Sequence, residues 1–167
     1  MSTPNIKIPK ILYDEAVKNG IDVEEIVLTT IVKALGLDPE MTMRARLKLA
    51  VKYLGEELID KDPVQAGEKL YKAAEECVKV LAQYYDLKDI LAKVNERGRW
   101  TVTDLASAVT VIADRLGKWF EEAWDAANYL HVWGFHEAKL DAELVRRRLP
   151  EVERIVNETQ KVLTNQA

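Results

Sequence analysis

Both histidines of the chain lie five residues apart in the segment NYLHVWGFHEAKLD, residues 128–141. Imidazole is the side chain best suited to moving protons near neutral pH, and it is a common metal ligand. Trp133 and Glu137 accompany His131 and His136, so an aromatic surface and a carboxylate are also at hand. This segment is the first candidate for an active site, a metal site or a ligand surface.

The spacing of the two histidines argues against a metal site. On a regular α-helix, residues five apart differ by about 140° around the axis, so His131 and His136 point to different faces. Paired histidine ligands on a helix prefer a spacing of four. Gly134 could break the helix and relax this constraint, and Glu137 could then add an oxygen ligand. Since no cysteine or third histidine accompanies them, we expect no metal and no cofactor.

The same segment also has a purely structural interpretation. Leu130 continues the apolar phase of the preceding helix, and Trp133 and Phe135 can cover the end of the core. Gly134 lets the chain turn, and Asp141 can cap the next helix. A histidine at the end of a helix can satisfy exposed carbonyl groups, where the helix dipole also favours a cation.

A second candidate is the loop NERGRWT, residues 95–101. Arg97 and Arg99 flank a glycine just before a predicted helix start, and Trp100 lies beside them. A helix N-terminus with basic neighbours can hold a phosphate, and tryptophan can stack on a base. The alternative is an ordinary loop with a packed tryptophan.

Predicted helices position both candidates. Apolar residues recur at spacings of three and four along most of the chain. The longest such repeat runs from Leu105 to Leu130 and predicts one helix of seven turns. The charged residues from Glu68 to Lys79 are expected to form a solvated face. Side-chain acceptors for helix starts are predicted at Asp22, Asp38, Asp62 and Thr101.

These elements predict an all-α protein, an up-and-down bundle of three to four long helices over residues 38–167. Residues 1–37 form a separate arm, in which NIKIP is the only strand-like piece and two short helical patterns follow. Strand, helix, helix is the order of a ribbon-helix-helix module, which pairs its strand with a second copy and can insert the ribbon into DNA. Only Lys7 and Lys10 are basic at this ribbon, so a dimerisation or packing arm is the favoured alternative.

Composition sets the broad class. The chain has 167 residues, with 48% apolar and 31% charged residues, as in a globular protein. The net charge of −4 argues against a general nucleic-acid binder. Cys77 is the single cysteine, so no intrachain disulfide can form, and we expect it to be buried. No membrane-spanning run or signal peptide is evident in the sequence, so we expect a cytoplasmic protein.

Longer blocks of sequence resemble known families. The stretch LKLAVKYLGEELIDKDPVQAGEKLYKAAEECVKVLAQYY resembles the first helical hairpin of HEPN-like domains. More specifically, GRWTV, AWDAANYLHVWGFHEAKLD and RLPEVERIV resemble the archaeal PaREP family, and the resemblance extends over nearly the whole chain. It implies a HEPN-like α-helical bundle. The wider HEPN group includes ribonucleases, partners of minimal nucleotidyltransferases and noncatalytic scaffolds.

The resemblance also provides a test for catalysis. HEPN ribonucleases usually carry an arginine followed, after four to six residues, by a histidine. The corresponding positions before His131 hold Trp124, Asp125 and Ala126. Those before His136 are equally without arginine, being Tyr129, Leu130 and His131. This departure from the motif argues against ribonuclease activity.

The sequence therefore favours a noncatalytic association module or a nucleotide- or RNA-binding module, acting as a homodimer. A nucleotidyltransferase-type protein or RNA is the partner that the resemblance implies. One alternative is a divergent, metal-independent ribonuclease that uses His131 or His136 with a distant arginine. Another is a DNA-binding regulator that acts through the N-terminal ribbon. The candidate ligand or partner surface comprises Arg97, Arg99, Trp100, His131, Trp133, His136 and Glu137.

Overall fold

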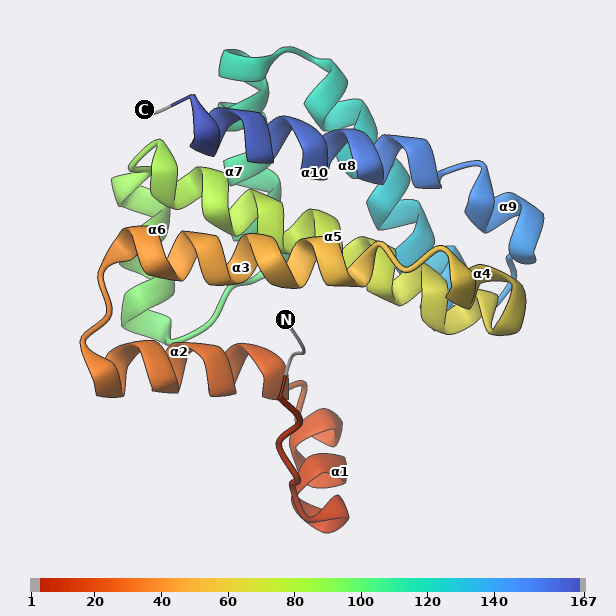
Figure 1. Cartoon of the computed structure of the whole chain (residues 1–167), viewed down its shortest axis with the longest axis horizontal. Coiled ribbons are helices and arrows are strands. Elements are labelled where there is room, and N and C mark those ends of the chain that lie inside the picture. Colours follow the sequence, from red (N-terminus) through yellow and green to blue (C-terminus); the bar gives the residue numbers. More distant parts are fainter. Residues whose placement is uncertain (1–3, 166–167) are drawn as a thin grey trace. The chain divides into compact units, whose positions relative to one another are not determined.

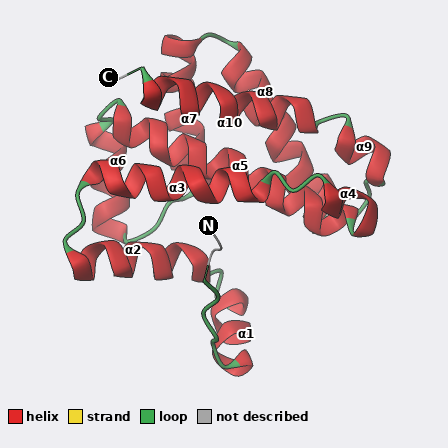
Figure 2. Cartoon of the chain, viewed as in Figure 1, coloured by secondary structure: helices red, strands yellow, loops and turns green. Residues whose placement is uncertain are grey.

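The computed structural model describes residues 4–165, and within them every regular element is a helix (Figures 1 and 2). This confirms the predicted all-α class. No helix in this part of the chain combines the length and apolar character needed to cross a membrane. The elements are α1 (Lys10–Lys18), α2 (Val23–Leu35), α3 (Pro39–Tyr53), α4 (Glu57–Lys61), α5 (Pro63–Tyr84), α6 (Lys88–Arg97), α7 (Val102–Leu116), α8 (Trp119–Tyr129), the π-helix η1 (Leu130–His136), α9 (Ala142–Arg146) and α10 (Leu149–Thr164).

The chain divides into two compact units after Thr42. The first unit contains α1, α2 and the first turn of α3. The second unit contains the rest of α3 and every later helix. The change from one unit to the other thus falls inside a continuous helix rather than in a linker.

The first unit has little core of its own. Helices α1 and α2 contact each other, but neither contains a buried residue. Asp22 caps α2 as predicted, accepting a hydrogen bond from the Glu25 amide at 3.1 Å. Gly36 ends α2 in the left-handed conformation, with φ 59°. The NIKIP segment, predicted to be strand-like, has no regular secondary structure in the part of the chain that the structure describes, so the predicted ribbon is not confirmed.

The second unit is built around α5, whose 22 residues include its most continuous buried surface. In Figure 1, α10 runs alongside α5, and these two helices contact each other and α8. Helix α7 and η1 also pack on α5. Small residues at the contact face of α5 allow this close approach. The largest fully buried side chains of the unit are Ile59, Leu70, Leu81, Ile112, Phe120, Leu130 and Ile155.

The predicted seven-turn helix from Leu105 to Leu130 is wrong, because the segment is broken into α7, α8 and η1. Gly117 ends α7 with φ 110°, a conformation that other residues rarely adopt. The Trp119 indole then donates a hydrogen bond to the Leu116 carbonyl at 2.7 Å, satisfying one group at the helix end. The apolar repeat does not reveal this break, because the buried face continues in phase across it.

The other predicted caps are confirmed. Asp62 accepts a hydrogen bond from the Gln65 amide at 3.0 Å at the start of α5. Asp38 does the same for the Met41 amide at 2.8 Å. Thr101 starts α7 with a complete capping box. Short-range spacing is enough to predict these starts, because each cap involves residues only three apart.

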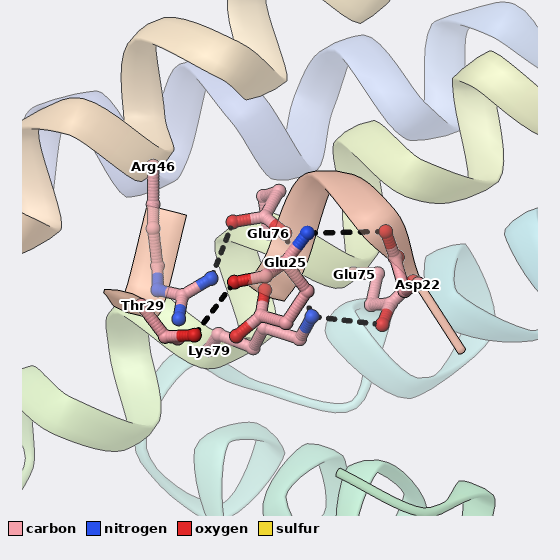
Figure 3. Close-up of polar contacts among 7 residues, drawn as sticks. All are labelled: Asp22, Glu25, Thr29, Arg46, Glu75, Glu76 and Lys79. Carbon is pink, nitrogen blue, oxygen red and sulfur yellow. Dashed lines mark hydrogen bonds and ion pairs between the residues drawn. The ribbon is translucent and has the colours of Figure 1, made fainter. Parts of the chain in front are cut away.

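The predicted solvated face from Glu68 to Lys79 is wrong, because Glu68, Lys72 and Glu75 are only partly exposed and the other two residues are buried. Glu76 and Lys79 are buried, and Glu76 accepts a hydrogen bond from Arg46 at 2.9 Å. Lys79 is paired with Glu75 at 2.9 Å, as Figure 3 shows beside the Arg46–Glu76 contact. Burial is tolerated because these charges are paired within the network.

Cys77 is buried on α5, as predicted. Burial raises the pKa of its thiol to about 12. The thiol therefore stays protonated near neutral pH, and Cys77 is a core residue rather than a reactive one.

Candidate functional site

The two histidines lie on η1, a π-helical segment that continues directly from α8. In a π-helix the backbone bonds run from residue i to residue i+5. The Glu137 amide follows this pattern, donating to the Val132 carbonyl at 2.9 Å. Residues five apart are therefore about one turn apart, and His131 and His136 share a face. The sequence argument that they point to different faces is wrong, because it assumed α-helical geometry.

Two glycines let η1 lie against α5. A Cβ at Gly67 of α5 would lie 3.3 Å from the Leu130 carbonyl oxygen and 3.7 Å from the Gly134 Cα. A Cβ at Gly134 would lie 3.4 Å from the Leu140 side chain. Leu130 itself is fully buried. The buried leucine and the backbone contact between the glycines hold η1 in place, which positions the adjacent histidines.

Glu68 of α5 meets the histidines from the facing helix. Its carboxylate lies 2.7 Å from Nδ1 of His131, so this nitrogen carries a proton and donates a hydrogen bond to the carboxylate. Nε2 of His131 lies 3.0 Å from Nε2 of His136. In the neutral pair, His136 therefore donates to the unprotonated Nε2 of His131. We call these three residues the Glu68–His131–His136 chain.

Aromatic rings pack against the Glu68–His131–His136 chain on its core side. The Tyr71 ring stacks on His131, with centroids 4.1 Å apart and planes 20° apart. Tyr71 also packs against Trp124 in the core. Burial, reinforced by Glu75 and Glu68, raises the pKa of Tyr71 above its usual range, so this phenol stays neutral. Stacking on a buried ring restricts the orientation of the His131 imidazole.

The outer end of the Glu68–His131–His136 chain, at His136, faces solvent. The side chain of Glu68 is 14% exposed and that of His131 is 23% exposed, whereas His136 is an exposed residue. Within residues 4–165, the other ring nitrogen of His136 has no hydrogen-bond partner. The Glu68–His131–His136 chain therefore runs from a mostly buried carboxylate to an imidazole that a dissolved molecule can reach.

The neighbouring candidates take different positions. Trp133 is 47% exposed, so it does not cover the core as its sequence position suggested. Glu137 is exposed, and the described residues place no side-chain partner against its carboxylate. Nor do they contain a cluster of three or more acidic, histidine or cysteine side chains arranged to hold a metal ion. The protein groups that the fold does bring together are the two imidazoles and Glu68.

The second candidate, the loop around Arg97, is used in capping a helix. Arg97 lies 2.5 Å from the Asp104 carboxylate, which also accepts hydrogen bonds from the amide and hydroxyl of Thr101. Burial alone would raise the pKa of Asp104, but the Thr101 hydrogen bonds and the Arg97 guanidinium hold it below its usual range. Trp100 packs against the core. Only Arg99 is exposed and without a partner in the described chain.

The two candidates do not form one site. In Figure 1 the loop between α6 and α7 and the π-helix that follows α8 lie at opposite ends of the second unit.

Sequence reasoning missed Glu68, which it assigned to a solvated face. Glu68 and His131 are 63 residues apart in sequence, and no local pattern marks their pairing. Only the packing of η1 on α5 reveals it.

Comparisons with known proteins give a family from the sequence and similar folds among solved structures. A sequence model of the archaeal PaREP1/PaREP8 family matches residues 45–156. The chain is similar to the crystal structure of a protein from Sulfolobus solfataricus, at 31% identity and a TM-score of 0.60, over 72% of this chain and 95% of that one. A solution structure of the same structural-genomics target shows 32% identity and a TM-score of 0.61, over 73% and 94% of the two chains. No curated protein matches this chain.

Proposed function

This chain belongs to the archaeal PaREP1/PaREP8 family, and we propose that it is a noncatalytic, HEPN-like helical protein that works by association as a homodimer. In this proposal the first unit is a ribbon-helix-helix-like dimerisation arm. The second unit carries the surface that binds a ligand or a partner. Association is the core of the proposal, and the first unit supplies the observation that supports it.

That observation is the apolar surface of the first unit. Helices α1 and α2 bury no residue, although both are rich in aliphatic side chains. Large contiguous apolar surfaces on a folded protein mark sites of association. The exposed large apolar residues described in this unit are Ile6, Ile8, Ile11, Leu12, Tyr13, Val17, Ile21, Ile26, Ile31, Leu35 and Met41.

A second copy of the chain is the partner that best suits this surface. Residues 5–9 alternate in polarity, yet their backbone pairs with no strand among residues 4–165. An antiparallel ribbon with the same residues of a second copy would satisfy these backbone groups. The symmetric pairing would also bring the apolar faces of α1 and α2 together with those of the other copy. Few basic residues lie at the ribbon, which favours dimerisation over insertion into DNA.

For the second unit we propose a nucleotide or RNA as the ligand, with the exposed face of η1 as the binding surface. Trp133 is half exposed there and can stack on a base. The alternative, a divergent ribonuclease, needs a cation beside the histidines to stabilise phosphate charge. Within residues 4–165, neither His131 nor His136 has an arginine among its hydrogen-bond partners. This geometry favours binding over cleavage.

Analytical ultracentrifugation tests the dimer. We expect the parent protein to sediment as a dimer and the double variant Ile11→Glu, Leu12→Glu to sediment as a monomer, because two charges enter an apolar contact. Val102→Glu is the matched control, since Val102 is an exposed apolar residue of the second unit, 75% exposed. It should leave the dimer intact. A monomeric parent, or a double variant that still dimerises, contradicts the proposal.

An RNA cleavage assay tests the noncatalytic part separately. Purified parent protein should leave a single-stranded RNA uncut. Cleavage by the parent that disappears in the double variant His131→Ala, His136→Ala would favour the ribonuclease instead. The sedimentation result and the cleavage result are independent, so each part of the proposal can fail alone.

A further inference from the structure

We propose that His131 and His136 form a two-imidazole site for a divalent transition-metal ion of the nickel or copper type, with Glu68 as the carboxylate that positions His131. This inference goes beyond the association proposed above and does not depend on it. It rests on the geometry of the Glu68–His131–His136 chain, which brings two potential ligand atoms together at the surface of the second unit.

The separation of the two nitrogens suits a shared metal ion. Nε2 of His131 and Nε2 of His136 are 3.0 Å apart. With metal–nitrogen bonds of about 2.0–2.1 Å, this separation corresponds to an angle of roughly 91–97° at the metal. Adjacent ligands in square-planar and octahedral complexes lie at such angles, and imidazole in tetragonal geometry favours Cu²⁺ or Ni²⁺. A tetrahedral ion would need the nitrogens about 0.35 Å further apart.

The orientation of the rings is consistent with this arrangement. The imidazole planes are 80° apart and the ring centroids are 4.4 Å apart. The rings therefore meet at an angle rather than end to end, as two adjacent ligands of one ion do. Without metal, the same nitrogens share a proton in a hydrogen bond. On metal binding this proton moves to the other ring nitrogen of His136, which leaves both Nε2 atoms free to coordinate the ion.

Glu68 supplies the support that a histidine ligand needs. Histidines that bind metals usually donate their second ring nitrogen to a carboxylate or carbonyl, which fixes the tautomer and strengthens the ligand. The Nδ1 of His131 makes this bond to Glu68 at 2.7 Å. Tyr71, stacked on the other side, holds the ring in place. His131 is thus already oriented with its Nε2 directed toward His136.

Two protein ligands leave most of the coordination sphere open. His136 faces solvent, so water would complete the sphere in the free protein. The open positions could accept a donor atom from a bound molecule, such as a phosphate oxygen. The site is therefore a docking point for a ligand rather than a closed structural metal site.

Isothermal titration with Ni²⁺ tests the site on the full chain without a polyhistidine tag. We expect one Ni²⁺ per chain in the parent and no binding in His131→Ala or in His136→Ala. Glu68→Gln should keep the stoichiometry and bind about 10- to 100-fold more weakly, because it loses the supporting carboxylate but neither ligand. The spectrum of Cu²⁺ bound to the parent should show coupling to two imidazole nitrogens, and this spectrum should be absent from either histidine variant.

Two results would overturn the proposal. One is the absence of Ni²⁺ binding by parent protein that is folded by circular dichroism. The other is binding that persists unchanged in the double variant His131→Ala, His136→Ala. Asn128→Ala, an exposed polar change just before the segment, is the control and should bind as the parent does.

Discussion

The π-helix η1 and the loop around Arg97 both attract attention in the sequence as clusters of functional side chains, but the fold uses them differently. In the loop, the Asp104 carboxylate accepts hydrogen bonds from Thr101 and Arg97, and the cluster closes on itself. In η1, the chain that begins at Glu68 ends at an imidazole open to solvent. A charged cluster whose hydrogen bonds are all made within it stabilises structure, whereas one that ends at an open hydrogen-bond acceptor can bind a ligand.

The two regions also differ in the interactions that fix their conformation. A capping box sets the loop, and its partners are only three residues apart in the chain. Close packing of Gly67 on Gly134 sets η1, and its partners are 67 residues apart. Changes in core packing should therefore disturb η1 most strongly. Changes in hydrogen bonding should disturb the loop, with smaller effects.

The largest effect is expected for Gly67→Val. Its side chain would press on the Leu130 carbonyl and on Gly134, so η1 would have to move away from α5. We expect a loss of about 1–3 kcal/mol in the free energy of unfolding, measured by urea denaturation. Gly55→Val is the control, because the nearest atom to a Cβ at Gly55 is 3.9 Å away. Equal losses in the two variants would show that η1 does not depend on this contact.

A smaller effect is expected in the loop for Thr101→Ala. The change removes the acceptor for the Asp104 amide and one donor to the Asp104 carboxylate. Loss of an N-cap typically costs about 1 kcal/mol, and the same denaturation experiment measures it. Thr103→Ala, an exposed threonine in the first turn of α7, should have little effect. A loss for Thr101→Ala as large as that for Gly67→Val would remove the contrast between the two regions.

The smallest effect is expected for Arg97→Gln. The pKa of Asp104 is lowered in the folded protein, so its contribution to stability is present above the unfolded pKa of about 3.9 and is lost as the pH falls through the folded value. Removing the guanidinium brings the folded pKa closer to the unfolded one. The contribution becomes smaller and is lost at a higher pH.

For this partly exposed pair we expect a loss of about 0.2–1 kcal/mol at pH 7 that shrinks toward pH 3. Urea denaturation across that pH range measures it. Arg99→Gln removes the same charge from an exposed neighbour and should leave the profile unchanged. A loss from Arg97→Gln that is constant from pH 7 to pH 3 would show that Asp104 is not the group involved.

Much of the local structure could be predicted from the sequence. The helix starts at Asp22, Asp62, Thr101 and Asp141 follow from side chains that reach amides three residues away. The all-α class follows from apolar periodicity, and the burial of Cys77 from its phase on α5. These features depend on short-range geometry, which a linear pattern contains.

The interruption at Gly117 and the π-helical geometry of η1 could not be predicted in this way. Periodicity assumes about 100° per residue, and that assumption placed His131 and His136 on different faces. The actual geometry depends on how closely α5 approaches, which is set by Gly67. A sequence pattern contains no information about that distance.

The sequence by itself determined which residues could do chemistry and that helices would present them. Only the tertiary structure decided which of these residues meet. Arg97 pairs with Asp104, which caps α7. The π-helix brings His131 to His136, and the packing of η1 on α5 brings His131 to Glu68. The physical reason is that helix capping depends on near neighbours, whereas a site assembled from two helices depends on contacts between distant parts of the chain.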